Sequence, residues 1–325
     1  MKGAVVSGFF SYFTSHFATL GHEFWPLLVG GLATGFIYSM VAIGYTMVYG
    51  VLRLINFAHS EVFMSGGFAS FFLTKWLVGS GTPSAWQSVL YVVLGVMVGG
   101  LAGAAIAALV ERVAYRPLRR RKAPKLAYLI SAIGASYFLF NLAAKEFGRI
   151  NFAMSPPFVN HALFQFANAP VEMLDVITLV VGLLMLFGLD RLVSKSKLGR
   201  SIRAVAQDAE TASLMGVNID RTIAVTFLLG GFLGGAAGYL FGLKFGVVYT
   251  MGFTPALKAF TAAVLGGIGN LRGALIGGLL LGVVESLSVA FVNGAYIDVV
   301  SFGVLVLVLL VRPTGILGES LGRAA

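Results

Sequence analysis

Long apolar runs follow one another along the whole chain, and this pattern limits the fold to one that spans a membrane. A transmembrane helix needs about 20 mostly apolar residues. Runs of suitable length and composition occupy 25–49, 54–77, 89–110, 126–146, 172–193, 223–243, 273–292 and 297–311. Segment 256–270 is shorter and glycine-rich, and segment 4–20 is apolar but weak. Only 11% of the residues are charged, whereas about 25% is usual in soluble domains. The sequence therefore predicts an all-α polytopic membrane protein with about eight to ten transmembrane helices.

Basic residues gather in two of the segments between these runs. Of the 23 Lys and Arg residues, thirteen lie in 111–125 and 191–221. Basic loops between apolar spans follow the positive-inside pattern, so the net charge of +10 reflects membrane orientation and gives no indication of nucleic-acid binding. Both segments are predicted to face the cytoplasm. Counting spans from them places the N-terminus outside with nine spans, or inside with ten if 4–20 also crosses.

A single membrane domain is expected over 25–318, with a cytoplasmic loop at 194–222. Segment 1–24 is predicted to be interfacial or a weak span, and its lack of a small-residue cleavage site argues against a cleaved signal peptide. Residues 319–325 are expected to form a C-terminal tail.

Motifs for catalysis and metal binding are missing from the sequence. There is no cysteine, so disulfides and thiolate metal sites are excluded. The four histidines form no HExxH pattern, and neither a GxSxG elbow nor a GxxxxGK[ST] phosphate-binding loop occurs. The sequence therefore predicts no catalytic residue, no metal ligand, no cofactor and no ATPase site within this chain.

Glycines recur at four-residue spacing in several of the apolar runs. They form three stripes: Gly230, Gly234, Gly238 and Gly242; Gly95, Gly99 and Gly103; Gly278 and Gly282. Small residues at this spacing leave one helix face nearly bare, so that helix backbones can approach one another in a membrane. Close packing is the main expectation, and lining of a transport pathway is the alternative.

Polar side chains are densest in the stretch RLINFAHSE, which joins two apolar runs and contains Arg53, Asn56, His59 and Glu61. Asn56 and His59 would share a face if this stretch were helical. An ionisable group inside a membrane usually faces protein or water. The stretch is therefore interpreted either as a broken helix beside a transport pathway or as a turn at the membrane surface with structural hydrogen bonds.

Glu285 lies inside the run 273–292 and is the other candidate for the pathway, with a buried structural role as the alternative. Four further polar residues lie near the ends of runs, where their side chains are expected to reach the membrane surface: Asn141, Lys244, Lys258 and Asp298.

A polar island, AVAQDAETASLMGVNIDR at 204–221, interrupts the apolar chain. Its Ala, Gln, Glu, Met and Leu residues favour a helix, and Gly216 is a natural C-terminal stop. The sequence predicts a short cytoplasmic helix whose small, partly apolar face can enter a groove on a partner. An ordinary solvated loop is the alternative.

Family-specific stretches accompany this island. Glu210, Ala212 and Gly216 have the spacing of the EAA---G loop of ABC importer permeases, although the Leu-Pro that ends many such loops is missing. The stretches AIGYTMVYGVLRLINFAHSEVFMSGGF, ERVAYRPLR, LISAIG, GRSIRAVAQDAETASLMGVNIDRTIAVTF, KAFTAAVLGGIGNLRGALIGG and DVVSFGVLVLVLLVRPTGILG resemble the LivH-type permease family of branched-chain amino acid transport. The resemblance runs from about Val29 to Gly318, with Ser60 where that family often has Gly.

The resemblance implies a type II ABC importer-like fold and an assembly in the cell inner membrane, surrounded by lipid. A LivM-type second permease would complete the pore, two cytoplasmic ATPase subunits would bind ATP, and a periplasmic binding protein would deliver the substrate and supply most of the selectivity. Segment 200–218 would be the coupling helix. The implied ATPase-coupling residues are Gly199, Arg200, Arg203, Asp208, Glu210, Ala212, Leu214 and Gly216.

Two other functional classes stay open on sequence alone. An ion-coupled secondary transporter would use His59, Glu61 and Glu285 as relay or ligand groups. Within the ABC class, similar permeases carry urea, amides and other amino acids, so the exact substrate is open. A membrane enzyme or a structural scaffold is disfavoured because the motifs for catalysis are missing.

Overall fold

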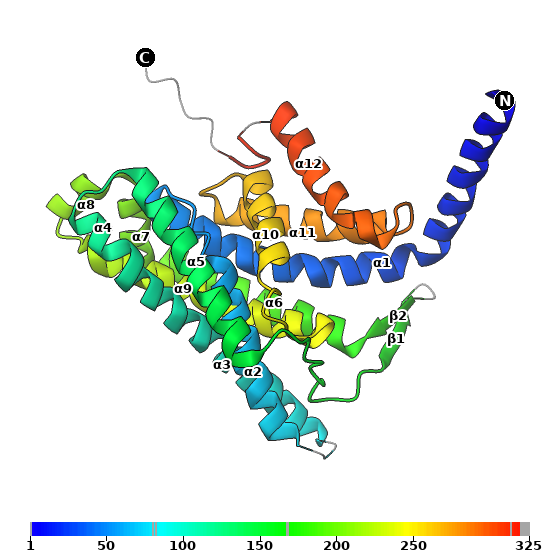
Figure 1. Ribbon diagram of the computed structural model, residues 1–325, viewed down its shortest axis with the longest axis horizontal. Coiled ribbons are helices and arrows are strands. Elements are labelled where there is room, and N and C mark those ends of the chain that lie inside the picture. Colours follow the sequence, from blue (N-terminus) through cyan, green and yellow to red (C-terminus); the bar gives the residue numbers. More distant parts are fainter. Residues whose placement is uncertain (1, 80, 82, 167–168, 313, 319–325) are drawn as a thin grey trace.

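The structure is a computed structural model that describes residues 2–79, 81, 83–166, 169–312 and 314–318. Within these ranges the chain is almost entirely helical (Figure 1). The helices are α1 (Lys2–Leu52), α2 (His59–Val78), α3 (Ala85–Val110), the π-helix η1 (Glu111–Tyr115), α4 (Arg116–Arg120), α5 (Lys125–Phe147), α6 (Met173–Lys195), α7 (Lys197–Gln207), α8 (Ala209–Leu214), α9 (Ile219–Phe245), α10 (Phe253–Gly266), α11 (Leu271–Ser288), the 3₁₀-helix η2 (Gly294–Tyr296) and α12 (Ile297–Val311).

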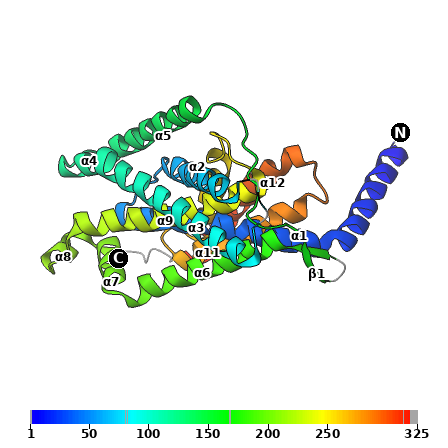
Figure 2. The same cartoon turned by 90° about the horizontal axis from the view of Figure 1, so that it is seen from below.

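One β-hairpin interrupts the helices, and the hydropathy pattern did not indicate it. β1 (Ala162–Phe166) pairs antiparallel with β2 (Ala169–Glu172), and the register shifts between Ala162 and Phe164. The hairpin lies at the opposite end of the molecule from α4, α7 and α8, as both views show (Figures 1 and 2). We call the end with α4, α7 and α8 the basic end, because it carries the loops 111–125 and 194–222. The positive-inside pattern predicted that these two loops lie on one side.

The core forms around α1 and α9. For each membrane-length helix we compare how much of its most apolar 18-residue stretch is buried. The buried share is 72% in α9 and 67% in Glu23–Leu52, but only 11% in α5 and 6% in Gly294–Val311. α9 packs against α1, α2 and α3, and α1 packs along α11, which α10 and α12 flank (Figure 1). Helices α5 and α12 therefore lie at the periphery of the chain, with apolar faces available to lipid or to another subunit.

Seven helices in the described part of the chain are long and apolar enough to cross a membrane, slightly fewer than the predicted eight to ten. α2, expected as the span 54–77, is not among them, because His59, Glu61 and Lys75 lower its hydropathy. α10, the predicted short span 256–270, has only 14 residues. The predicted all-α, polytopic architecture is confirmed; α2 falls outside the seven candidate spans through its polar residues, and α10 through its short length.

The N-terminal helix is continuous through the region predicted as a separate segment. α1 runs from Lys2 to Leu52 and contains Pro26. Figure 1 shows its first part turning away from the rest of the molecule, and proline is a common cause of such bends because it removes a helical hydrogen bond. The interfacial role of 1–24 stays a prediction, and the tail 319–325 lies outside the described residues.

Glycine contacts explain how the central helices approach so closely. A methyl group added at Gly235 on α9 would collide with backbone atoms of Gly99 on α3, and one added at Gly66 on α2 would collide with Gly235. On the other side of the core, a methyl group at Gly282 would meet Gly35 of α1. Gly99, Gly103, Gly238 and Gly282 of the predicted stripes thus meet neighbouring backbones, as the packing interpretation predicted, whereas Gly95, Gly234 and Gly242 make room for side chains.

We expect Gly235→Ala to lower the thermal stability of the protein in detergent. The added methyl group would force α9 away from α3, and overpacking of this kind costs about 1–3 kcal/mol. Gly134→Ala on α5 is the matched control, because a methyl group there meets open space. Thermal unfolding of both variants checks the prediction, and equal midpoints for the two would contradict it.

Candidate functional site

The polar island folds into two helices instead of the single helix predicted for it. α7 ends at Gln207 and α8 begins at Ala209, with Asp208 between them. The Asp208 carboxylate accepts hydrogen bonds from the backbone N–H groups of Glu210 at 2.9 Å and Thr211 at 3.2 Å, and from the Thr211 hydroxyl at 2.6 Å. Asp side chains favour this N-cap position, which is why the helix breaks there. The same hydrogen bonds hold the pKa of the Asp208 carboxyl below its usual range.

Three of the predicted coupling residues face the permease itself. Gly199 on α7 packs directly on the backbone of Val193 at the end of α6, and Arg203 donates to the carbonyl oxygens of Val193 and Ser194. Ala212 on α8 is 5% exposed. These residues attach the loop to the membrane domain and leave other side chains to face outward.

The outward side of α8 carries an apolar pair. Leu214 is 88% exposed and Met215 is 81% exposed, and Arg200 and Glu210 are also exposed. Gly216 follows with φ of +84°, a left-handed conformation that favours glycine. We call residues 197–218 the coupling loop. Its tip is a fixed helical turn with exposed apolar side chains at the basic end of the molecule (Figure 1).

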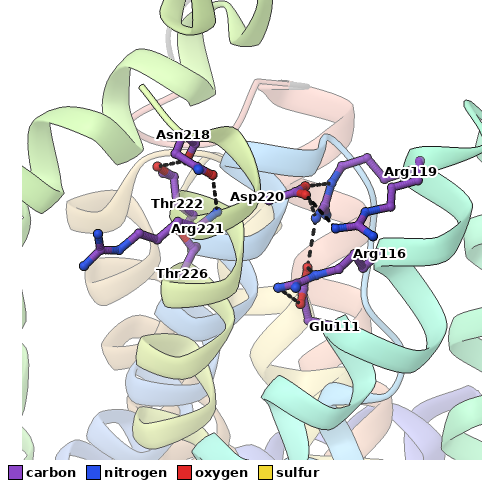
Figure 3. Close-up of polar contacts among 9 residues, drawn as sticks. Glu111, Arg116, Arg119, Asn218, Asp220, Arg221, Thr222 and Thr226 are labelled. Atoms are coloured by element: carbon purple, nitrogen blue, oxygen red, sulfur yellow. Dashed lines mark hydrogen bonds and ion pairs between the residues drawn. The ribbon is translucent and has the colours of Figure 1, made fainter. Parts of the chain in front are cut away.

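An ionic cluster connects this loop to the other basic segment (Figure 3). The Arg119 guanidinium donates to Asp220 in the first turn of α9 at 2.6 and 2.9 Å, and to Glu111 at 2.9 Å. Arg116 donates to Glu111 at 3.0 and 3.3 Å. The Glu111 side chain is 1% exposed, so its charge is balanced inside the protein. The sequence signal was Glu111 ahead of the run RPLRRR, which charge counting attributed to membrane orientation alone.

The stretch before α2 is non-helical, and its polar residue Asn56 is buried. Residues 53–58 fall between α1 and α2, with Asn56 only 2% exposed. The Asn56 side-chain oxygen accepts from the backbone N–H of Ala58 and from the Tyr115 hydroxyl, both at 3.1 Å. The condition under which Asn56 and His59 would share a helix face is not met, because Asn56 precedes the helix and its side chain bonds within the turn. The two interpretations of the stretch, a broken helix beside a pathway and a turn at the membrane surface, both stay predictions: the helix is interrupted here, and Arg53 at the start of the turn is exposed beside α7 at the basic end. We call residues 53–58 the α2 break.

His59 fits into space left by two glycines. A methyl group on Gly44 of α1 would come within 2.6 Å of its Nε2 atom, and one on Gly234 of α9 within 3.2 Å. The Tyr45 ring lies edge-on at 4.6 Å between centroids. Within the described part of the chain, His59 Nε2 and the Asn56 amide nitrogen are buried without a hydrogen-bond partner. Glycine spacing in α1 and α9 thus makes room for an imidazole in the core.

Glu61 lies in the first turn of α2 and is 4% exposed. Its carboxylate accepts from the hydroxyls of Ser60 and Ser136, each at 3.1 Å. Ser136 belongs to α5, so this carboxylate joins α2 to a peripheral helix.

Glu285 belongs to a second cluster. Lys258 on α10 lies 2.7 Å from Glu285 on α11 and 2.7 Å from Asp298 on α12. The hydroxyls of Tyr38 and Ser301 donate to Glu285 at 3.3 Å. The Lys258 side chain is 7% exposed, so the expectation that it reaches the membrane surface is wrong. The reason is that α10 lies beside α11 and α12, each of which places one carboxylate next to Lys258, and the chain order alone did not reveal this arrangement.

The other three residues expected near the membrane surface behave differently from one another. Lys244 forms an ion pair of 2.9 Å with Asp175 of α6 and is 21% exposed. Asn141 is exposed and donates to the Tyr137 carbonyl at 2.7 Å. Asp298 is 54% exposed beside Lys258.

Two cavities lie away from these buried polar groups. One of about 360 Å³ is lined by Phe71, Lys75, Asn151, Phe152 and six neighbouring residues, where α2 ends and segment 151–155 passes. Another of about 10 Å³ is lined by Tyr45, Thr46 and Phe260 among others. Asn56, His59, Glu61 and Glu285 line neither cavity, so these side chains are packed within the protein in this conformation.

Comparison with known protein families finds one family whose sequence pattern covers most of the chain. The family described as the branched-chain amino acid transport system / permease component matches residues 27–309. The chain belongs to this family. Membership makes it a multi-pass membrane permease component of a transport system, and the predicted resemblance is confirmed.

Individual relatives agree over nearly their full length. The chain is 43% identical to the high-affinity branched-chain amino acid transport system permease protein LivH of Escherichia coli K12, covering 90% of this chain and 94% of that protein. It is 42% identical to the permease protein BraD of Pseudomonas aeruginosa, over 90% and 95%. A probable LivH of Methanocaldococcus jannaschii is 28% identical over 90% and 92%. No solved structure matches the chain significantly.

We expect Lys258→Met to destabilise the protein by about 3–5 kcal/mol, because it leaves the Glu285 carboxylate without its cation. The double variant Lys258→Met/Glu285→Met removes both charges and should recover part of that loss. Thermal unfolding in detergent measures both. A double variant no more stable than the single one would show that the ion pair is not the cause.

Proposed function

We propose that this chain is the transmembrane permease subunit of an ATP-driven importer for branched-chain amino acids. It resides in the cell inner membrane and forms the translocation path together with a LivM-type second permease. Two cytoplasmic ATPase subunits bind the ATP, and a periplasmic binding protein delivers the substrate. Family membership over 27–309 and the absence of a phosphate-binding loop from the sequence support a subunit that depends on separate ATPases.

The observation that carries the proposal is the exposed tip of the coupling loop. Leu214 and Met215 project from the end of α8 at the basic end, which the positive-inside pattern assigns to the cytoplasm. Apolar side chains exposed on a rigid helix suit a groove on a soluble partner. We assign them to the ATPase contact, with Arg200 and Glu210 as its exposed polar neighbours. Gly199, Arg203, Asp208, Ala212 and Gly216 hold the loop in shape.

Asn56, His59 and Glu61 are proposed to lie beside the translocation path. They are buried polar groups in a membrane domain, which usually serve function or pair with one another, and two of them have buried nitrogen atoms without a partner among the described residues. Glu285 is paired with Lys258, so we propose for it a role in joining α10, α11 and α12. The printed names of the relatives favour branched-chain amino acids over urea or amides.

Purification of the tagged chain from its native membrane in mild detergent, followed by mass spectrometry and uptake in proteoliposomes, tests the proposal. Two ATPase subunits and a second permease should accompany the chain, and uptake should require ATP and the binding protein. A lone chain that transports on an ion gradient without ATP would instead establish a secondary transporter.

We expect Leu214→Asp to remove most of the bound ATPase from the purified complex. Burying an uncompensated carboxylate in place of an apolar anchor weakens an interface by about 30-fold or more. Leu163→Asp is the matched control, since Leu163 is an exposed leucine in β1 at the opposite end. The ratio of ATPase to permease after affinity purification measures the effect. Equal ratios for the two variants would contradict the assignment of the ATPase contact.

Gly216→Leu should abolish uptake while the chain still inserts into the membrane. The left-handed conformation at this position strains a branched side chain and would distort the end of α8. Gly216→Asn is the control, because asparagine tolerates this conformation better than most residues. Uptake per inserted permease distinguishes the two, and normal uptake by Gly216→Leu would exclude coupling through this turn.

A further inference from the structure

The α2 break is held at both ends by elements connected to the coupling loop. At its start, Arg53 has a left-handed φ of +53° and donates to the carbonyl oxygen of Ala206 in the last turn of α7, at 3.2 Å. Further along, Asn56 accepts from Tyr115 at 3.1 Å. The break leads directly into His59, so the coupling loop and the buried polar residues are only a few contacts apart.

The second of these connections runs through the ionic cluster. Asp220 follows the coupling loop in the first turn of α9, and its carboxylate binds Arg119 at 2.6 Å. Arg119 also binds Glu111, the first residue of the π-helix. Because one guanidinium serves both carboxylates, the start of α9 cannot move away from the π-helix without breaking a charged hydrogen bond (Figure 3).

The π-helix ends at Tyr115, whose ring is 1% exposed and packs against Phe227 of α9 at 5.3 Å between centroids. π-helical turns are rare and are frequent at functional sites. Returning this turn to α-helical bonding would rotate Tyr115 around the helix axis by about one residue, or ~100°. That rotation would take the Tyr115 hydroxyl away from Asn56. The contact between Tyr115 and Asn56 therefore depends on the π-helical arrangement of this turn.

We propose that Asp220, Arg119, Glu111, Tyr115 and Asn56 form a transmission link that carries movement of the coupling loop to the α2 break. The π-helix is the element that changes state, and Arg119 and Tyr115 are positioning residues for the polar groups that follow the break. The link rests on the proposed function, because it needs an ATPase that moves the coupling loop. It adds a specific route from that movement to the interior of the membrane domain.

The test uses the complete importer reconstituted in proteoliposomes, with uptake and ATP hydrolysis measured on the same sample. Asp220→Asn removes the charge that binds Arg119, and Tyr115→Phe removes only the hydroxyl that binds Asn56. Each is expected to lower the amount of substrate imported per ATP hydrolysed by roughly three- to tenfold, with the ATPase subunits still bound. Asp220→Glu keeps the charge and should restore most of the ratio.

Tyr128→Phe is the matched control for Tyr115→Phe. Tyr128 is 9% exposed and lies 6.1 Å from the Tyr115 ring, yet its hydroxyl makes no hydrogen bond within the described residues. Its loss should leave the ratio unchanged. If Tyr115→Phe acted through a general packing defect near the π-helix, uptake and ATP hydrolysis would fall together, or the amount of substrate imported per ATP would fall in both tyrosine variants. Either result would contradict the proposed link.

The double variant Asp220→Asn/Tyr115→Phe decides whether the two contacts belong to one link. If both contacts belong to one link, the combined loss of substrate imported per ATP should be smaller than the product of the single losses. The reason is that loss of either contact already uncouples the other. A combined loss equal to the product, or unchanged ratios in the single variants, would overturn the proposal. Uptake by the wild-type complex is measured before any variant. Wild-type complexes without ATP-dependent uptake would refute the proposed function itself.

Discussion

Close contact between helix backbones is the constraint on which the rest of this structure depends. In a bilayer the hydrophobic effect does little to bring helices together, so association relies on packing and hydrogen bonds. Glycines on α2, α3 and α9 bring three backbones into contact around Gly235, and glycines on α1 and α11 do the same around Gly282. A contact of this kind leaves little space for side chains to rearrange. The central helices are therefore suited to move as rigid units, with changes of shape confined to the connections between them.

Those connections are where the polar groups gather. The α2 break contains Asn56, the π-helix begins at Glu111, and the coupling loop is broken at Asp208. Asn56 and Asp208 accept hydrogen bonds from backbone N–H groups beside these interruptions, while Glu111 binds the side chains of Arg116 and Arg119. Polar side chains and interruptions of regular helix therefore coincide along the chain.

Much of the fold was predictable from hydropathy, and much of the site was not. Apolar runs located α3, α5, α6, α9 and α12, because a helix that crosses the hydrocarbon core needs an uninterrupted apolar stretch of about 20 residues. The start of α2 at His59 and the division at Asp208 depended on local side-chain bonds that hydropathy averages out. The contacts of Lys258 with Glu285, and of Arg119 with Asp220, join residues 27 and 101 positions apart. Such pairs depend on which helix faces meet, and periodicity within one helix does not specify that.

The ion pairs of Lys258 also bear on how the chain enters the membrane during synthesis. An unpaired lysine in the middle of a membrane helix opposes insertion by about 2.5–3.5 kcal/mol. Lys258 is made before both of its partners, Glu285 and Asp298, so α10 emerges from the ribosome with an uncompensated charge. α10 has only 14 residues and little apolar length to offset this penalty. We therefore expect α10, α11 and α12 to leave the insertion machinery as one group, after the last of the three has been translated.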